Sequence, residues 1–220
     1  MSLRAANRER RRQRILAAAR SLIEDGGFDD LSMRALAERA GVSVTTLYNL
    51  YGSKDQIRFA LVSALIDGID AVLETIPLAR PLERARAVVT VSIEHMVRNG
   101  KLCRVGLLAN ACGPDGIADA DVTPRAVEMQ RVAIAAAIEE GLLRPDLHPT
   151  LLGGQIYDGF RRASLLWAAG LLDADGFRDR ALYAFYVCLL GVATEATRPA
   201  MLTELAALEA RLDRARESAA

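Results

Sequence analysis

The sequence predicts an all-α fold of about ten helices, and three observations lead to this prediction. Aromatic residues make up 5% of the 220 residues, whereas Ala, Leu, Arg and Glu, which enter a helix at low free-energy cost, are abundant. Apolar residues recur at a spacing of three and four in one segment after another, as on the buried face of a helix. Between these segments, no alternation of apolar and polar residues is long enough to indicate a strand.

Serine and glycine mark the ends of the first expected helices. Ser32, Ser43 and Ser53 each precede a helical pattern, and a serine hydroxyl there can accept a hydrogen bond from the first turn. Gly41 and Gly52 follow two of these patterns, and glycine commonly ends a helix because it adopts a positive φ without strain. The four expected helices span residues 8–25, 33–40, 44–51 and 54–76.

Six further segments have helical periodicity, and turn-forming residues separate them. The breaks include Gly113-Pro114-Asp115-Gly116, Arg144-Pro145 and Pro199. No internal repeat of solenoid length is present, and no low-complexity linker divides the chain. The expected helices span residues 82–99, 102–112, 124–143, 149–171, 177–198 and 202–216.

The charges of the chain are unevenly distributed, although the formal net charge is zero. Residues 1–20 contain seven arginines and one glutamate, a net charge of +6, so the remaining residues carry a net charge of −6. Such a basic end is typical of a segment that binds a polyanion, and the acidic remainder would then have another task. A solvated basic tail explains the same charge pattern, and both interpretations stay open at this point.

Composition argues against a membrane protein and against export. The longest stretch without a charged residue, Ala181 to Thr194, has 14 residues, whereas a helix needs roughly 20 to cross a bilayer. The arginine-rich N-terminus is not followed by an apolar segment and cleavage site of the signal-peptide kind. Cys103, Cys112 and Cys188 are widely spaced in apolar surroundings and are expected to be small buried residues rather than a disulfide framework. We therefore expect a cytoplasmic protein.

No constellation of residues in the sequence indicates an enzyme. The chain has no Glu-x-x-His pair of the kind used by helical metal oxidases and no His-Glu-x-x-His motif. It has no glycine-rich phosphate loop and no cysteine beside an evident base. We therefore expect no catalytic residue, no metal site and no cofactor.

The stretch "AGVSVTTLYNLYGSKDQI", residues 40–57, joins two short helices through a turn that contains glycine. This arrangement is the helix-turn-helix signature, in which the second helix enters the major groove of DNA. That helix would run from Val44 to Tyr51. Its N-terminus presents backbone N–H groups to phosphate, and Thr45 and Thr46 on its first turn can reach base edges or thymine methyls. Tyr48 can donate its hydroxyl to a phosphate.

Other residues near this motif allow more than one interpretation. Lys54, at the start of the following helix, adds a positive charge close to the same DNA backbone. The arginines of residues 4–14 could lie along the backbone or minor groove as an arm, or could be a solvated tail. A threonine pair and two tyrosines can also simply cap and pack a three-helix unit, and Val42, Leu47 and Tyr51 are expected to form that core.

The stretch "FDDLSMRALAERAGVSVTTLYNLYGSKDQI" resembles the N-terminal domain of the TetR family of one-component bacterial transcriptional regulators, over about residues 8–60. The Gly-Phe bend, the Ala-Gly-Val-Ser turn, Thr-Leu-Tyr and Gly-Ser-Lys-Asp occur in the family's order. The resemblance implies a three-helix DNA-binding domain, residues 1–53, followed by a helical ligand-binding and dimerisation domain, residues 54–220. By the same resemblance, DNA contacts are expected from Arg34, Ser43, Thr45, Thr46, Tyr48, Asn49 and Lys54.

The resemblance also implies the function, which is a cytoplasmic homodimer that binds a palindromic double-stranded DNA operator and is released from it by a small molecule. Repression is the expected sign of regulation. Thr45 occupies a position where the family often has glycine, and Leu50 one where tyrosine or histidine is common, so the half-site sequence does not follow from the family. The alternative function is a helical DNA-binding or scaffold protein that senses no ligand.

The body of the chain offers candidates for a pocket and for an interface between subunits. A mostly apolar pocket with a few polar groups is expected among the helices after residue 54, although each candidate could equally be an ordinary core or surface residue. Phe185, Leu189 and Val192 are the interface candidates, and packing within one subunit would require the same residue types. The pocket candidates are His95, Met96, Cys103, Leu107, Asn110, Gln130, Tyr157, Phe160, Arg161 and Trp167.

Overall fold

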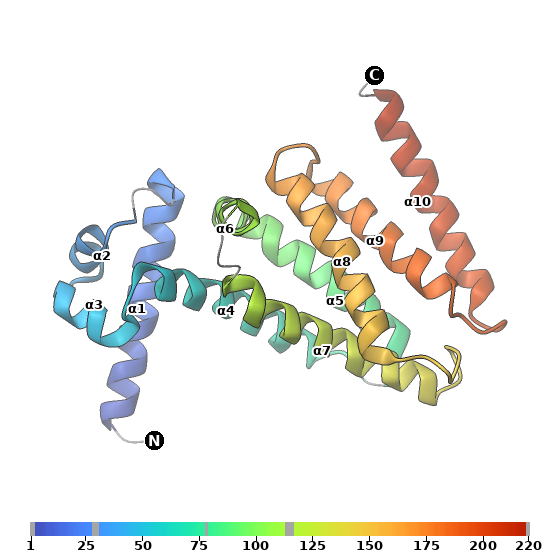
Figure 1. Ribbon diagram of the computed structural model, residues 1–220, viewed down its shortest axis with the longest axis horizontal. Helices are drawn as coiled ribbons and strands as arrows, with labels where there is room; N and C mark the ends of the chain where they lie inside the picture. The colour runs from blue at the N-terminus through green and yellow to red at the C-terminus, as the bar shows by residue number, and fades with distance from the viewer. Residues whose placement is uncertain (1–2, 28–30, 78, 113–116, 219–220) are drawn as a thin grey trace.

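The computed structural model describes residues 3–27, 31–77, 79–112 and 117–218, and these residues form ten α-helices and one isolated β-bridge (Figure 1). The prediction of an all-α fold with about ten helices is confirmed. Among the described residues, no helix is long and apolar enough to cross a bilayer. The helices are α1 (Leu3–Gly26), α2 (Met33–Ala40), α3 (Val44–Tyr51), α4 (Lys54–Leu73), α5 (Pro81–Arg98), α6 (Gly100–Cys112), α7 (Ile117–Glu139), α8 (Pro149–Ala168), α9 (Ala174–Leu190) and α10 (Arg198–Ser218).

Side-chain caps set the ends of α2 and α3 where the sequence predicts them. The hydroxyl oxygens of Ser32 and Ser43 accept hydrogen bonds from the backbone N–H groups of Ala35 and Thr46, respectively. Gly41 then ends α2 with φ of 62°, a left-handed conformation that suits glycine. These caps join α2 and α3 through a short, well-defined turn.

The N-terminal core includes residues from helices outside the first three. Ile15, Leu36 and Leu47, from α1, α2 and α3, are each 0% exposed and pack together. Ile57 of α4 and Leu102 of α6 belong to the same cluster. In Figure 1 this unit lies at one end of the molecule, and α4 continues from it into the body. The first two turns of α4 are therefore part of the N-terminal unit as well as its connection to the body.

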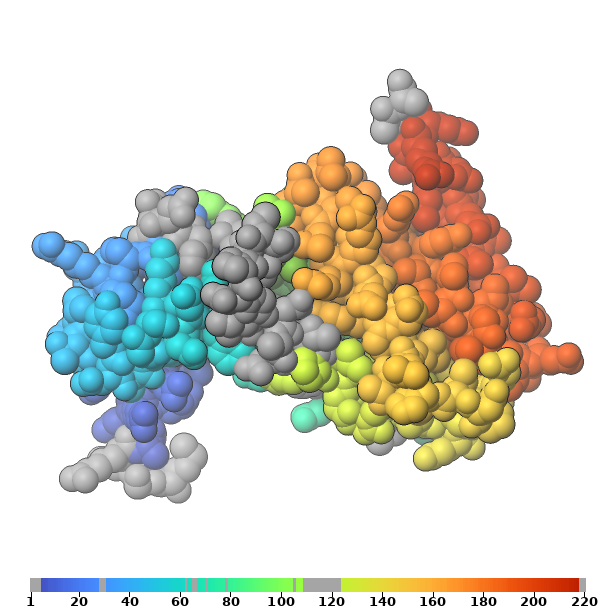
Figure 2. Space-filling model, in the orientation of Figure 1, coloured from blue at the N-terminus to red at the C-terminus, as the bar shows by residue number. Residues whose placement is uncertain are grey.

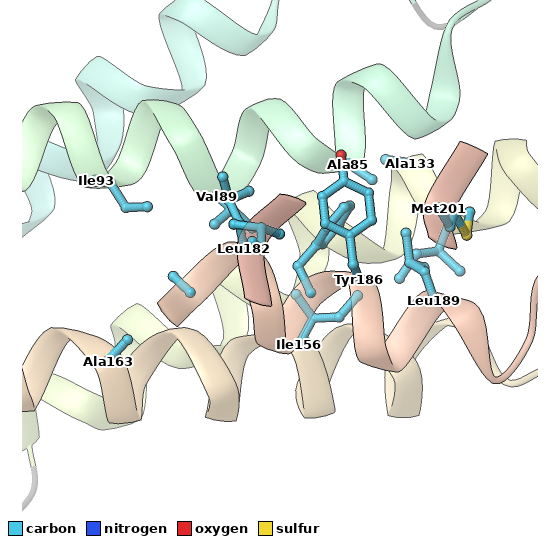
Figure 3. Packing of buried hydrophobic residues seen from close by; sticks show 14 of the residues in the cluster. Ala85, Val89, Ile93, Ala133, Ile156, Ala163, Leu182, Tyr186, Leu189 and Met201 are labelled. Carbon is cyan, nitrogen blue, oxygen red and sulfur yellow. The ribbon is translucent and has the colours of Figure 1, made fainter. Parts of the chain in front are cut away.

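The body is a bundle in which α8 packs against α7 and α9, while α10 packs on α9. Figure 3 shows the centre of this bundle, where Val89 of α5, Ile156 of α8 and Leu182 of α9 face one another. The ring of Tyr186 points from α9 toward α5 in the same view. Trp167, which is 2% exposed, stacks on Phe177 with 5.4 Å between the ring centroids. Burial of these side chains is the main source of stability of the body.

Several helix boundaries differ from the prediction. Helix α1 begins at Leu3 rather than at residue 8, because the Ala- and Arg-rich segment before the apolar stripe also favours a helix. Helix α7 begins at Ile117 and contains Pro124, since one missing N–H does not by itself end a helix. Helix α9 ends at Leu190, eight residues before its predicted end at residue 198, which is instead the first residue of α10. The predicted break at residues 113–116 lies outside the described residues.

Candidate nucleic-acid interface and body hollows

Helix α3 presents polar side chains on one face and buries the opposite face. Leu47 is 0% exposed and Tyr51 is 7% exposed, and both belong to the N-terminal core. Thr45, Tyr48 and Asn49, spaced as one helix face requires, are exposed, and the Tyr48 side chain is 51% exposed. These three side chains make no hydrogen bond to the described part of the chain. Figure 2 shows the blue and cyan atoms of the N-terminal helices at one end of the molecule.

Ser43 and Thr46 are engaged in capping α3. The Ser43 Oγ atom accepts the Thr46 backbone N–H at 3.1 Å and lies 2.8 Å from Thr46 Oγ1. Thr46 is half-buried, whereas Thr45 is exposed. The structure therefore brings all seven predicted DNA residues except Arg34 onto α3 or next to its ends, but it gives two of them a structural role in the free protein.

The arginine-rich segment is part of α1 rather than an extended arm. The Arg12 guanidinium lies 5.3 Å from the centroid of the Tyr51 ring, and the Tyr51 hydroxyl donates a hydrogen bond to the Arg12 carbonyl at 3.2 Å. Burial raises the pKa of Tyr51, although the nearby Arg12 opposes this shift. Arg8 and Arg11 are exposed on the same helix. Helix α1 thus fixes one end of α3 and keeps several arginines at the surface.

Lys54 and Val44 lie at or next to the ends of α3, and Arg34 lies on the preceding helix. Arg34 is exposed on α2, and Lys54 begins α4 and is half-buried. Val44, on the first turn of α3, is 38% exposed. The residues predicted to contact DNA do not include Val44. Its position on the first turn of α3, between the Ser43 cap and Thr45, is the sequence signal that could have identified it.

The first turn of α6 connects the N-terminal unit to the body. The Lys101 Nζ group donates hydrogen bonds to the carbonyl oxygens of Glu24 and Asp25 at the end of α1. Leu102, the next residue, is 5% exposed within the N-terminal core. A cation at a helix C-terminus interacts favourably with the helix dipole. Lys101 and Leu102 therefore connect the body to the N-terminal unit at a point separate from α4.

The next two residues of α6 attach to the body instead. Cys103 is 8% exposed in the body core, where burial raises the pKa of its thiol to about 11. The Arg104 guanidinium lies 4.3 Å from the centroid of the Trp167 ring and donates to the Trp167 carbonyl. Cys103 and Trp167, which the sequence predicts as pocket residues, are thus packed in the core. Their residue types suit both roles, so sequence could not separate them.

The remaining pocket candidates are distributed over the body. Gln130 is 2% exposed; its Nε2 donates to the Ala85 carbonyl at 3.0 Å, and its Oε1 has no partner. The His95 ring packs so closely on α4 that a Cβ atom at Gly68 would lie 2.8 Å from its Cε1. The other candidates are as follows: Met96, Leu107, Tyr157, Phe160 and Arg161 are half-buried, and the side chain of Asn110 lies outside the described residues.

A hollow of about 520 Å³ lies between α4, α5 and α7, and we call it the α4–α5–α7 hollow. Its charged side chains are Arg84, Arg125 and Glu128. Arg84 and Arg125 contact residues of α4, and Glu128 contacts another residue of α7. None of the ten predicted pocket residues lines this hollow. Its apolar lining consists of Leu73, Pro124, Met129 and Val132.

The predicted interface residues lie mostly inside the subunit. Phe185 and Leu189 are each 1% exposed and belong to the body core, so they have no surface to offer a second copy of the chain. Val192, in the turn after α9, is half-buried and packs against the same core. The prediction is wrong for Phe185 and Leu189, because the α9 face that carries them is covered by the other helices of the body.

A different face of α8 and α9 is exposed. Val187 of α9 is 44% exposed, and Leu171, between α8 and α9, is 71% exposed. A second hollow, of about 670 Å³, lies beside them between α8, α9 and the far half of α10. Gly159 and Ala184 line it, and a Cβ atom at Gly159 would lie 2.6 Å from the Ala184 Cβ. Gly159 thus permits the close approach of α8 and α9.

The N-terminal part of the chain matches a known family. A profile described as "Bacterial regulatory proteins, tetR family" matches residues 15–61. The chain is 36% identical over 89 residues to the HTH-type transcriptional repressor KstR of Rhodococcus jostii, a match that covers 40% of this chain and 42% of that protein. It is 34% identical over 84 residues to the HTH-type transcriptional regulator BetI of Rhizobium meliloti, covering 37% and 41%. The matches span less than half the length of these relatives.

Similarity to solved structures extends over most of the chain. Thermus thermophilus FadR, a TetR-family transcriptional repressor in complex with lauroyl-CoA, superposes with a TM-score of 0.69 at 23% identity, covering 84% of this chain and 96% of that one. A TetR transcription regulator from Haloarcula marismortui superposes with a TM-score of 0.70 at 17% identity, covering 84% and 100%. Residues 15–61 thus belong to the TetR family of bacterial regulatory proteins, and the fold of the chain is similar to that of solved TetR-family regulators.

Proposed function

We propose that the protein is a transcriptional repressor that binds a palindromic DNA operator as a homodimer and leaves it when a small molecule binds the body. The observation that carries the DNA-binding part is the exposed face of α3, where Thr45, Tyr48 and Asn49 have no partner in the described chain. A packed core holds the recognition helix in place, and these three side chains form no hydrogen bond to the described part of the chain. Such side chains are suited to contact DNA. The names of the KstR relatives support repression as the sign.

We assign different tasks to the residues of this surface. Thr45 and Asn49 would read base edges in the major groove, while Tyr48 would contact phosphate. Ser43 and Thr46 would hold the first turn of α3 in shape and approach the backbone there. Arg34 and Lys54 would contact phosphates that flank the groove. We divide the chain functionally at residue 53, although Ile57 and Leu102 complete the N-terminal core.

The body would act on the DNA-binding unit through two connections. Helix α4 runs from the unit into the body, and the α6 residues Lys101 and Leu102 attach to α1 and to the N-terminal core. An effector would bind preferentially to a conformation of the body in which the protein cannot bind DNA. This binding would shift the two connections and change the separation of the two α3 helices in a dimer. The coupling is reciprocal, so operator binding must weaken effector binding by the same factor. FadR, which has the same fold, was crystallised with a small molecule, and this supports an effector site in the body.

Selection of bound sequences from random duplex DNA, at one stated salt concentration, tests the proposal directly. Salt must be fixed because phosphate contacts make the affinity depend on ionic strength. A palindrome with half-sites about one helical turn apart is the expected result. Recovery of no sequence above background would contradict operator recognition and would favour the alternative of a scaffold protein. The recovered duplex then serves as the probe in every DNA-binding measurement below.

A further inference from the structure

The α4–α5–α7 hollow combines an apolar lining with a cationic edge. Met129 and Val132 of α7 and Leu73 of α4 provide apolar surface, and Arg84 and Arg125 provide two guanidinium groups. The volume of about 520 Å³ falls in the range of roughly 300–1,000 Å³ that small-molecule sites occupy. A ligand that suits this lining has an apolar body and one anionic group.

Arg84 is the cation best placed to receive an anion. The guanidinium is half-buried, and its Nη1 atom donates to the carbonyl oxygens of Leu73 and Ile76, the latter at 2.7 Å. Both bonds leave from the same nitrogen, and the described part of the chain provides no acceptor for Nε or Nη2. These two nitrogens form one edge of the guanidinium fork, which matches the two oxygens of a carboxylate.

The other charges of the hollow leave it cationic. Glu128, the one carboxylate among its lining residues, forms a two-point hydrogen bond with Arg131, with both distances 2.6 Å. This contact lowers the pKa of Glu128, so its charge is already matched by Arg131. Arg125 pairs with Asp67 of α4 at 2.7 Å. Arg84 therefore has no carboxylate partner among the described residues, and its charge is the one that an added anion would neutralise.

We propose that the α4–α5–α7 hollow binds an amphipathic carboxylate, with its head group on Arg84 and its apolar part against Met129 and Val132. The proposal rests on the proposed function, because it names the chemical class of the effector. The head group would take the Nε and Nη2 edge of Arg84, while Nη1 of the same guanidinium keeps its bonds to the Leu73 and Ile76 carbonyls. Occupation of the hollow thus acts directly on the helix that joins the body to the DNA-binding unit.

Calorimetric titration of the full-length protein with decanoate, in the absence of DNA, tests the site. We expect one decanoate per chain with a Kd below about 1 mM, and at least about tenfold weaker binding of decan-1-ol, which lacks the charge. Arg84→Gln should weaken decanoate binding at least about tenfold. The matched control is Arg80→Gln, which removes an exposed arginine of the same segment that pairs with Glu83 outside the hollow.

A second variant keeps the test decisive if the loss of Arg84 impairs folding. Val132→Trp fills the apolar part of the hollow and leaves the bonds of Arg84 to α4 in place, and it should also abolish decanoate binding. Thermal unfolding followed by circular dichroism verifies that each variant is folded; if Arg84→Gln is not, Arg84→Lys removes the fork and keeps the charge. Equal binding of decanoate and decan-1-ol, retention of decanoate binding by either variant, or no binding at about 1 mM would overturn the proposal.

A separate measurement distinguishes this site from the proposed function. The affinity for the selected duplex is measured with and without saturating decanoate, and a decrease is expected for the wild type but not for Val132→Trp. Loss of decanoate binding in the variants, together with an unchanged operator affinity in the wild type, would retain the binding site and reject its role as the effector site. A protein that selects no DNA at all would reject the proposed function and leave the calorimetric result valid.

Discussion

Two exposed side chains one turn apart on α3 differ in what they can recognise. The Tyr48 phenol ends in a single hydroxyl that suits a phosphate oxygen, whereas the Thr45 side chain is short and carries both a hydroxyl and a methyl group. A short side chain reaches DNA only where the helix itself enters the groove. Under the proposed function, Thr45 would therefore read the base sequence and Tyr48 would position the helix.

We predict that substitutions of phosphate-contacting and base-contacting residues change DNA binding in different ways. Tyr48→Phe and Lys54→Ala should weaken binding to the selected and to a random duplex by similar factors. Thr45→Ala should change the preferred base at one position of each half-site, with a discrimination change of about 1–3 kcal/mol. Repeated selection with each variant measures this, and Thr150→Ala, an exposed threonine on the first turn of α8, is the control. Equal losses on specific and random DNA for Thr45→Ala would contradict its assignment to base reading.

The thiol of Cys103 links burial to the pH dependence of stability. Its ordinary pKa of 9.0 is raised to about 11 by burial, so the thiol ionises more easily in the unfolded chain than in the folded one. Below pH 9 both states are protonated and the full stability is present. As the pH rises from 9 toward 11, the unfolded state is stabilised by ionisation, and the free energy of unfolding falls.

We predict that Cys103 accounts for roughly 2–3 kcal/mol of stability that is lost over this alkaline range. Denaturant unfolding of the wild type and of Cys103→Ala at several pH values between about 8 and 11 measures the loss. The comparison is needed because burial also raises the pKa of Tyr51 and of Tyr186. Cys103→Ala is less stable at neutral pH, but its stability should fall less with rising pH. Parallel curves for the two proteins would contradict the prediction.

Sequence identified the buried face of the helix-turn-helix better than it identified the body site. Leu47 and Tyr51 are core residues as predicted, and Val42 packs against the same core, because periodicity directly reports which side of a helix is apolar. Residue type and position predict Trp167 as a pocket residue, whereas the structure places it in the core. Arg84 was not named at all, since its partners are backbone carbonyls that leave no pattern in the sequence.

At the scale of elements, the first turn of α6 divides its four residues between the two halves of the molecule. Lys101 and Leu102 contact α1 and the N-terminal core, and Cys103 and Arg104 contact the body. The residues of one helical turn keep fixed relative positions, because backbone hydrogen bonds join each turn of the helix to the next. Movement of α6 relative to the body must therefore be transmitted to the end of α1.

We predict that Lys101→Met loosens the end of α1 without disturbing the body. The side chain keeps its apolar length but loses the charged hydrogen bonds to the Glu24 and Asp25 carbonyls, a local loss of about 1–2 kcal/mol. Hydrogen exchange of peptides covering residues 20–27 should become faster, while exchange in α8 and α9 is unchanged. Arg98→Met, an exposed residue in the last turn of α5, is the control. Unchanged protection of residues 20–27 would show that Lys101 contributes nothing there.

The boundaries of the elements were predictable where a local cap sets them. Ser43 and Gly52 act on the residues next to them, so the bounds of α3 were predicted correctly. The turn between α9 and α10 depends instead on distant residues: the hydroxyls of Thr194 and Thr197 donate to the Leu142 carbonyl. This carbonyl lies more than fifty residues away in the sequence, so the residues around α9 do not indicate the bonds that hold this turn, although Gly191 directly follows the helix.

For the whole molecule, the surface that pairs two subunits decides whether two α3 helices can reach one operator. Phe185 and Leu189 are buried in the core, so the proposed homodimer requires another surface. Val187 and Leu171 provide exposed apolar side chains on α9 and after α8, and Gly159 permits the close approach of these two helices. Apolar surface on a helix pair is suited to pack against the same pair of a second copy.

We predict that Val187→Glu separates the dimer and, through that, weakens operator binding. A carboxylate at this position would be buried without a partner twice in a symmetric interface, which costs several kcal/mol per dimer. Sedimentation should show a monomer, and affinity for the full palindrome should fall to that for a single half-site. Leu202→Glu is the matched control, because Leu202 of α10 is 47% exposed against 44% for Val187 but lies outside this face. A dimer that survives Val187→Glu and still binds the palindrome would place the interface on another surface.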